Sequence, residues 1–328
     1  MLSGPEALPA GAGRPSLRHE AAAPPRRARG RAVSDRPIWS RDGRDWPNRQ
    51  ASRFVEAGGL RWHVQVMGQG PVMLLAHGTA ASTHSWRALM PLLAQHFTVV
   101  APDLPGHGFT SMPPIARLSL PGMAEALSAL VRALGTPPAH AAGHSAGAAV
   151  LARMALDSRI APESLVGLNA ALLPIGREHH EFFSRAAKLL AGLPFVPTVF
   201  AWSASNRSVA ERLLRDTGSA IEPRGVELYA RLFRHSGHLR AALGMMANWD
   251  LKPLLRDLPR LRPPLTLLVG SRDRTIPPAD TQRVKEVLRS ARIVALPGLG
   301  HLAHEERPEQ VAEAMRRAAA EAAPASAA

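Results

Sequence analysis

The sequence predicts an α/β fold with a mostly parallel, eight-stranded sheet, helices on both faces and a helical cap insertion. Two observations predict it: apolar runs of strand length alternate with helical stretches along most of the chain, and one long interval interrupts that alternation. With 328 residues the chain can bury the core that such a sheet requires. We expect ligands at the carboxyl ends of the strands, where parallel sheets collect them.

The predicted sheet begins with two runs that flank Gly58-Gly59, a pattern typical of a β-hairpin. The predicted strands are 52–57, 60–67, 72–76, 97–101, 139–143, 164–168, 265–269 and 293–296. Helical stretches at 120–134 and 148–156 separate some of these runs. This spacing favours crossover connections and therefore a parallel sheet.

Between about Leu173 and Leu261 the sequence contains no convincing strand. The helical stretches in this interval are 177–190, 209–215, 226–233 and 239–249. An insertion of this size between two strands predicts a cap over the strand ends. We therefore expect a disordered basic tail at 1–36, a core formed by 37–173 and 262–328, and a helical cap at 174–261.

The net charge is +14, from 40 lysines and arginines against 26 acidic residues. Such a charge favours nucleic-acid or anionic-membrane binding in principle. However, Lys188, Lys252 and Lys285 are the only lysines, and the arginines occur in a chain rich in Ala and Pro. Biased composition and a basic tail explain the charge better, and no nucleic-acid-binding motif accompanies it. We expect no nucleic-acid partner, and a docking patch for an acidic protein stays open.

The chain contains no cysteine, which excludes disulfides, thiolate metal sites and a cysteine nucleophile. This composition fits a reducing cytoplasm. No residue cluster has metal-ligand spacing and no glycine loop fits a nucleotide, so we expect neither a metal nor a cofactor. No uninterrupted apolar run reaches 18 residues, and no apolar segment follows Arg26-Arg27, so we expect no transmembrane segment and no twin-arginine export signal.

The run Gly143-His144-Ser145-Ala146-Gly147 matches the G-x-S-x-G nucleophile elbow of α/β-hydrolases. In this motif a strand turns sharply into a helix and raises the serine above the sheet, so that bulky neighbours would collide with the crossing chain. The pattern is short enough to arise by chance. Its setting, with an apolar run before it and the helical stretch 148–156 after it, favours a genuine elbow and predicts Ser145 as the nucleophile.

A serine nucleophile needs a base, and the base needs an orienting carboxylate. In this fold their order is serine, acid, histidine. Asp273 directly follows the strand-like run 265–269, and His301 follows the next run and precedes a C-terminal helix. Either residue alone is more often an ordinary turn or loop residue; together, in the required order, they predict the acid and the base. Asn169 ends an earlier strand but carries no charge.

An oxyanion hole needs two backbone N–H donors, which we assign to Ala146 and Thr79. Around the nucleophile we expect a substrate pocket that reaches into the cap. Its predicted residues are His77, Trp86, His144, Phe183, Met245, Met246 and Trp249. For most of these residues packing is the more frequent role, and His77 is also expected to pin the loop that carries Thr79.

Several segments resemble the magnesium-chelatase accessory family of bacteriochlorophyll biosynthesis, whose members have an α/β-hydrolase fold. The resemblance runs from about Arg36 almost to the C-terminus. The segments are RDGRDWPNRQASRFVEAGGLRWHVQ, HGTAASTHSW, VVAPDLPGHGFTSMP, GHSAGAAVLARMALD, GMMANWDLKPLLRDLPRL and LPGLGHLAHEERPEQV. HG, PDLPGHG and GHSAG occur widely among α/β-hydrolases, whereas the first and fifth segments are more specific.

The resemblance implies a cytoplasmic protein of a photosynthetic bacterium that acts in the pathway inserting magnesium into protoporphyrin. One hypothesis is an esterase-like serine hydrolase acting on a tetrapyrrole or another small ester or thioester. The alternative is a non-catalytic factor that binds a porphyrin or assembles with magnesium-chelatase subunits. Dehalogenase chemistry is weaker, because it needs a carboxylate where Ser145 stands. We also expect porphyrin binding between the cap and the loops that carry Thr79, Ser145 and His301.

Overall fold

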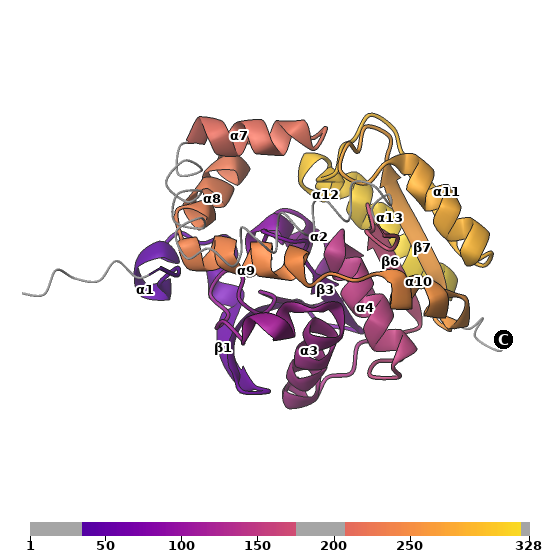
Figure 1. Ribbon diagram of the computed structural model, residues 1–328, viewed down its shortest axis with the longest axis horizontal. Helices are drawn as coiled ribbons and strands as arrows, with labels where there is room; N and C mark the ends of the chain where they lie inside the picture. Colours follow the sequence, from indigo (N-terminus) through magenta and orange to yellow (C-terminus); the bar gives the residue numbers. More distant parts are fainter. Residues whose placement is uncertain (1–34, 175–206, 323–328) are drawn as a thin grey trace, which may run out of the picture. The chain divides into compact units, whose positions relative to one another are not determined.

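The computed structural model describes residues 35–174 and 207–322. Within them lies an eight-stranded sheet in the order β1-β2-β4-β3-β5-β6-β7-β8, which confirms the predicted fold class (Figure 1). β2 pairs antiparallel with β1 and β4, and all other pairs are parallel. The strands are β1 (Ser52–Ala57), β2 (Leu60–Met67), β3 (Val72–Ala76), β4 (Thr98–Pro102), β5 (His140–His144), β6 (Ser164–Leu168), β7 (Leu265–Gly270) and β8 (Arg292–Leu296).

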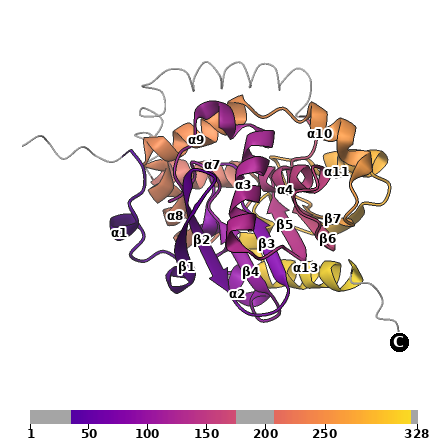
Figure 2. The same cartoon turned by 90° about the horizontal axis from the view of Figure 1, so that it is seen from below.

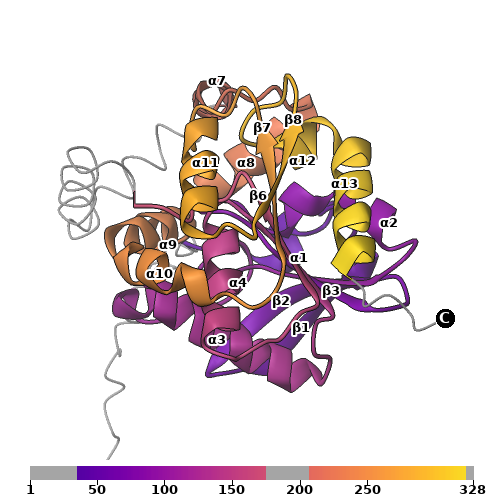
Figure 3. The same ribbon diagram turned by 90° about the vertical axis from the view of Figure 1, so that its right-hand side faces the viewer.

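Helices cover both faces of the sheet because successive strand residues point to opposite sides. In β3, Leu74 packs in the cluster formed with α3 and α4, whereas Leu75 packs in the cluster formed with α2 and α13. Figure 3 shows these two helix layers on either side of the strands. The helices of the core are α1 (Trp39–Asp42), α2 (Leu89–Leu93), α3 (Leu120–Leu134), α4 (Ala146–Leu156), α11 (Pro278–Val287), α12 (Ala303–Glu306) and α13 (Pro308–Ala322).

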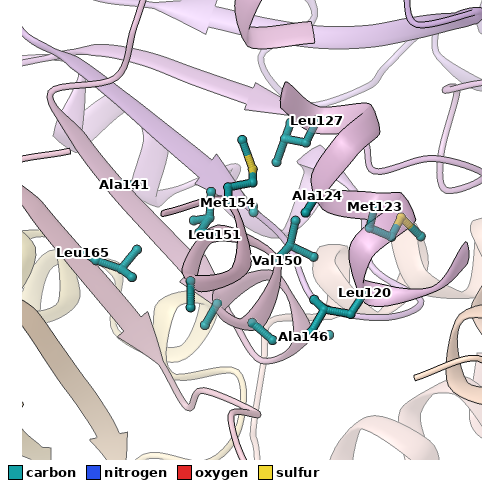
Figure 4. Packing of buried hydrophobic residues seen from close by; sticks show 14 of the residues in the cluster. Leu120, Met123, Ala124, Leu127, Ala141, Ala146, Val150, Leu151, Met154 and Leu165 are labelled. Atoms are coloured by element: carbon teal, nitrogen blue, oxygen red, sulfur yellow. The ribbon is translucent and has the colours of Figure 1, made fainter. Parts of the chain in front are cut away.

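α3 and α4 lie side by side and form much of one core layer (Figure 2). Their apolar side chains, among them Leu127, Val150 and Met154, are fully buried (Figure 4). α3 begins at a serine cap, where Ser119 Oγ accepts from Gly122 N at 3.4 Å. α4 follows β5 without a loop, because the chain turns at a single residue, Ser145. This packed layer fixes the position of that turn.

In its described part, the segment between β6 and β7 contains helices and no strand, as the sequence predicts for the cap. They are α7 (Arg207–Asp216), α8 (Pro223–Phe233), α9 (Ser236–Ala247) and α10 (Lys252–Asp257), with a 3₁₀ turn after α10. α7, α8 and α9 correspond to three of the predicted stretches. The predicted helix 177–190 and the predicted pocket residue Phe183 lie outside the described residues.

The first described residues pack against both the core and the cap. Arg36, which the sequence analysis places in the tail, is half-buried, and its guanidinium donates to Gly106 O at 3.0 Å. Trp46 is 2% exposed and its indole N–H donates to Thr83 Oγ1 at 3.1 Å. Gly237 N, in α9, donates to Asp35 O at 2.7 Å. Residues 35 and 36, which the prediction assigns to the tail, therefore contact the cap and the core.

No helix among residues 35–174 and 207–322 is long and apolar enough to cross a membrane. The same residues contain no group of three or more histidine or acidic side chains arranged to hold a metal ion.

Candidate active site

Ser145 occupies the sharp turn between β5 and α4, with φ 50° and ψ −118°. This strained conformation is held by backbone bonds, since Ser145 N donates to Leu168 O at 2.9 Å and Ala171 N donates to Ser145 O at 3.1 Å. A Cβ on Gly143 would lie 2.3 Å from Ala148 N, and one on Gly147 would lie 2.1 Å from the carbonyl oxygen of Ala76. Both glycines are therefore required by the close passage of the chain.

Asp273 and His301 lie together at the carboxyl ends of neighbouring strands. His301 Nδ1 is 2.8 Å from Asp273 Oδ2, and both side chains are buried. The other carboxylate oxygen, Asp273 Oδ1, accepts from Thr275 N at 2.8 Å and Ile276 N at 2.9 Å. These bonds hold the carboxylate toward the imidazole. They leave His301 Nε2 as the ring nitrogen available for proton transfer.

The loop carrying His301 is held to its surroundings by five contacts. Asn169 Nδ2 donates to His301 O at 2.8 Å and to Gly300 O at 2.9 Å. His144 Nε2 lies 2.9 Å from His301 O. Two further bonds, Leu302 N to Ser219 Oγ and Gly300 N to Glu306 Oε1, are each 2.8 Å. The position of His301 is therefore set by core, cap and C-terminal elements together.

Ser145 Oγ forms no hydrogen bond with any described residue. The His144 ring, next in sequence to Ser145, lies 4.7 Å from the His301 ring between centroids. Serine–histidine bonds are often loose before substrate binds. The Asp273–His301 bond is thus formed in this structure, whereas the Ser145–His301 bond is not.

The loop after β3 passes beside Ser145. A Cβ on Gly78 would be 3.2 Å from Ser145 Cβ, which places the neighbouring Thr79 close to the elbow. Among the described residues, the Thr79 N–H has no hydrogen-bond acceptor. Ala146 is the first residue of α4, whose N–H lacks a helical partner by geometry. Both N–H groups assigned to the oxyanion hole are thus unpaired near Ser145.

His77 pins this loop through both ring nitrogens. Its Nδ1 lies 2.8 Å from Gly78 O, and its Nε2 accepts from Leu104 N at 2.8 Å. The backbone donor at Nε2 requires the proton to be on Nδ1. Burial lowers the pKa of His77 and keeps the ring neutral. Because both ring nitrogens of His77 bond to the backbone, the ring has no nitrogen left to bind a ligand.

Four other predicted pocket residues lie in different surroundings. Met245 lies beside the candidate oxyanion loop, with Thr79 Oγ1 3.6 Å from its sulfur, and Trp249 is half-buried on the same cap segment. Met246, by contrast, is 48% exposed. Trp86 is fully buried and packs on His304 with ring centroids 4.7 Å apart, and so belongs to the core.

A buried polar cluster beside the site was not anticipated from the sequence. The Arg87 guanidinium forms an ion pair with Glu305, and Tyr229 OH donates to Glu305 Oε1 at 2.8 Å. Arg87 Nε also donates to Glu222 Oε1 at 2.8 Å. Burial raises the pKa of Glu305, opposed by the Arg87 guanidinium and the Tyr229 hydroxyl. This cluster joins α8 of the cap to α12. Its acidic member, Glu305, lies four residues after His301 in the sequence.

A family model described as the alpha/beta hydrolase family matches residues 73–314. The chain belongs to the alpha/beta hydrolase family. It is 38% identical over 80% of its length to the magnesium-chelatase 30 kDa subunit of Rhodobacter capsulatus, covering 92% of that protein. This relationship confirms the resemblance found in the sequence.

Other members of the alpha/beta hydrolase family are similar over most of the chain. The pimeloyl-[acyl-carrier protein] methyl ester esterase of Xylella fastidiosa is 29% identical over 77% of this chain and 97% of its own. The crystal structure of an alpha/beta hydrolase fold protein from Burkholderia ambifaria superposes with a TM-score of 0.68 at 23% identity. That superposition covers 80% of this chain and 96% of the other. At this identity it supports the fold alone.

Sequence reasoning did not identify Asn169 and Ser219 as residues that hold the His301 loop, and it did not identify the Arg87–Glu305–Tyr229 cluster. For Asn169 the sequence argument weighs only the role of triad acid, although a polar residue that ends a buried strand next to β5 can also bond to a neighbouring loop. Tyr229 is the single tyrosine of the chain, which is a weaker signal. Ser219, Arg87 and Glu305 carry no local pattern, because their partners are distant in sequence.

Proposed function

We propose that this chain is a serine hydrolase that cleaves an ester or thioester bond, with Ser145 as nucleophile, His301 as base and Asp273 as orienting acid. One observation carries the proposal: the chain forms a His301–Asp273 bond of 2.8 Å and also holds Ser145 in the elbow conformation. The esterase activity in the name of one relative supports the same class of reaction.

In the proposed reaction, Ser145 Oγ attacks the carbonyl carbon while its proton passes to His301 Nε2. Asp273 stabilises the imidazolium that forms. The N–H groups of Thr79 and Ala146 bind the developing oxyanion. The C–O or C–S bond then breaks, and His301 returns the proton to the leaving group. Water, deprotonated by the same imidazole, hydrolyses the acyl-enzyme and restores Ser145.

The proposed setting is the cytoplasm, at the magnesium-chelatase step of bacteriochlorophyll biosynthesis. The name of the Rhodobacter capsulatus relative supports the link to magnesium chelatase. The proposed substrate class is a tetrapyrrole ester or another small ester or thioester, and chelatase subunits are the proposed partners. A tetrapyrrole would lie between the cap and the loops of Thr79, Ser145 and His301.

Serine-directed fluorophosphonate labelling tests the nucleophile. The purified chain should become labelled at Ser145, and Ser145→Ala should lose both labelling and hydrolysis of p-nitrophenyl acetate. Ser128→Ala is the matched control, because it removes a buried hydroxyl that donates to Ala124 O within α3, remote in sequence from the elbow. Labelling and hydrolysis that survive in Ser145→Ala would contradict the proposal.

A second candidate is an accessory protein that binds a porphyrin or the chelatase without hydrolysis. Two observations favour it: the relative's name describes a chelatase subunit, and Ser145 Oγ has no hydrogen bond to His301. Under this alternative the chain resists fluorophosphonate. Titrated protoporphyrin should still quench tryptophan fluorescence, equally in wild type and Ser145→Ala.

A further inference from the structure

A cavity of about 510 Å³ lies between the cap and the loop that carries Asp273. Neither Ser145 nor His301 lines it. One wall comes from α7 and the chain that follows it, and the opposite wall comes from Arg272 and Arg274. The two walls are joined by a backbone bond from Arg274 N to Thr217 O, 3.1 Å long. The cavity is therefore distinct from the candidate active site.

Four arginines and one glutamate are the charged residues that line this cavity. Glu211 is paired with Arg215, one helical turn away, at 2.9 Å. Arg207, Arg272 and Arg274 form no ion pair with any described residue. The cavity thus presents three cationic side chains without a protein counter-ion in the described part of the chain.

The absence of a counter-ion at Arg272 and Arg274 has a structural cause. Asp273 stands between them in sequence and would be their natural partner. Its carboxylate is turned inward, where it accepts from Thr275 N, Ile276 N and the His301 ring, and the residue is 5% exposed. The geometry of the candidate triad therefore leaves both guanidinium groups free to take another anion.

Apolar side chains form the inner part of the same cavity. Leu214 and Val226 are 8% and 6% exposed, whereas the arginines are exposed. Ile221 and Pro223 also line it. An apolar interior with cationic groups at the surface matches a ligand that has an apolar body and an anionic end.

We propose that this cavity binds a small amphipathic anion, whose carboxylate, phosphate or sulfonate lies against Arg272 and Arg274 and whose apolar body contacts Leu214 and Val226. This site does not depend on the proposed hydrolase activity, because none of its residues belongs to the triad. A ligand here would contact the cap and the acid loop at once.

The test uses two fluorescent probes with the same ring system and the full chain. 8-Anilinonaphthalene-1-sulfonate carries a charge, and N-phenyl-1-naphthylamine lacks it. We expect saturable binding of the sulfonate, weakened about tenfold in Arg272→Ala/Arg274→Ala and by added salt. Binding of the neutral probe should be unchanged. Both arginines enter the backbone network through N–H groups that alanine retains, so the double variant should keep its melting temperature.

The matched control is Arg53→Ala/Arg289→Ala, which removes two exposed arginines that do not line the cavity. It keeps sulfonate binding under the proposal. Equal weakening in the control would show a general charge effect and would overturn the proposed site. Unchanged sulfonate binding in Arg272→Ala/Arg274→Ala, equal loss of both probes, or no saturable binding in the wild type would do the same. Hydrolysis by Ser145 is tested separately, so failure of either proposal is distinguishable.

Discussion

Asn169 shows why a carboxylate could not stand at the end of β6. Its Nδ2 donates to the carbonyl oxygens of Gly300 and His301, and its Oδ1 accepts from Gly270 N at 2.8 Å. An aspartate would place a negative oxygen against two carbonyl oxygens. Asn169 also has φ 44°, a left-handed conformation that asparagine tolerates better than most residues. The amide joins the acid strand β7 to the loop that carries His301.

Replacing Asn169 with alanine should leave three buried backbone groups short of a partner. We expect a loss of about 1–3 kcal/mol in the free energy of unfolding, measured by urea denaturation. If the proposed hydrolysis holds, kcat should fall while KM stays nearly constant, because substrate contacts are retained and His301 is displaced. Asn248→Ala is the control, since Asn248 Nδ2 also donates to a carbonyl, Gly244 O at 2.7 Å, within α9. Equal kinetic effects in both variants would contradict a positioning role.

The residue scale also shows what sequence can and cannot predict. Chain order and strand-end placement were enough to nominate Ser145, Asp273 and His301, whose catalytic roles remain predictions. The positioning roles of Asn169 and Ser219 were not predicted, because these side chains bond to backbone atoms of a loop more than 80 residues away in the chain. A pattern of side chains cannot reveal a partner that is a carbonyl or an N–H.

At the scale of elements, the Arg87–Glu305–Tyr229 cluster fastens the cap to the core. Arg87 follows the 3₁₀ turn Thr83–Trp86, Tyr229 lies on α8 and Glu305 on α12. Arg87→Met should lower the free energy of unfolding by about 3–5 kcal/mol, because it leaves the Glu305 carboxylate buried without its counter-ion. Urea denaturation would measure this loss.

A matched pair of variants separates burial from charge. Arg316 pairs with Glu313 at 2.6 Å on α13, where both side chains are half-exposed, so Arg316→Met should cost less than about 1 kcal/mol. The double variant Arg87→Met/Glu305→Met should be more stable than Arg87→Met alone, since no buried charge is stranded. If Arg87→Met lowered the free energy of unfolding no more than Arg316→Met does, the cluster would not hold the cap.

The strands and cap helices were largely predictable because their signals are local. Apolar runs of strand length gave eight strands within a residue or two of the observed bounds, and helical periodicity gave α7, α8 and α9. Which helix meets which loop depends on contacts between distant residues. The link from α8 to α12 therefore emerged from the structure alone.

At the scale of the whole molecule, the distribution of buried histidines predicts sensitivity to acid. The histidines that are buried and have a lowered pKa include His77, His84, His107, His144, His238 and His304. Desolvation is the largest cause in each case, and it lowers the pKa of His238 and His304 to about 3. These rings stay neutral in the folded chain while the unfolded chain takes up protons below its pKa of 6.5.

The free energy of unfolding should therefore decrease as the pH falls below about 6.5, by up to roughly 1.4 kcal/mol per pH unit for each such histidine. Urea denaturation at pH 8, 7, 6 and 5 measures the slope. His304→Phe should reduce this slope, because neither His304 nitrogen has a hydrogen-bond partner in the described part of the chain and the ring packs on Trp86. His96→Gln replaces an exposed histidine and should leave the slope unchanged. A constant free energy from pH 8 to 5 would refute the prediction.

Truncation tests where the folded unit begins. Removing residues 1–33 should leave the melting temperature unchanged, because that segment has too few apolar residues to contribute a core. Removing residues 1–46 also deletes Arg36 and the buried Trp46. We expect a loss of about 3–5 kcal/mol in the free energy of unfolding from the missing indole alone. Differential scanning calorimetry of both variants measures the melting temperature. A large decrease on removal of residues 1–33 would contradict this prediction.

The segment from Thr217 to Ser219, directly after α7, constrains how this molecule could be redesigned. Thr217 O accepts from the acid loop and Ser219 Oγ accepts from the histidine loop, so two groups of the cap complete the backbone bonding of the candidate catalytic loops. Cap and core are thus not independent modules. A chimera that grafts a relative's cap onto this sheet would need equivalent acceptors at both points. Without these acceptors the chimera would have the relative's pocket, but its candidate catalytic loops would not keep their positions.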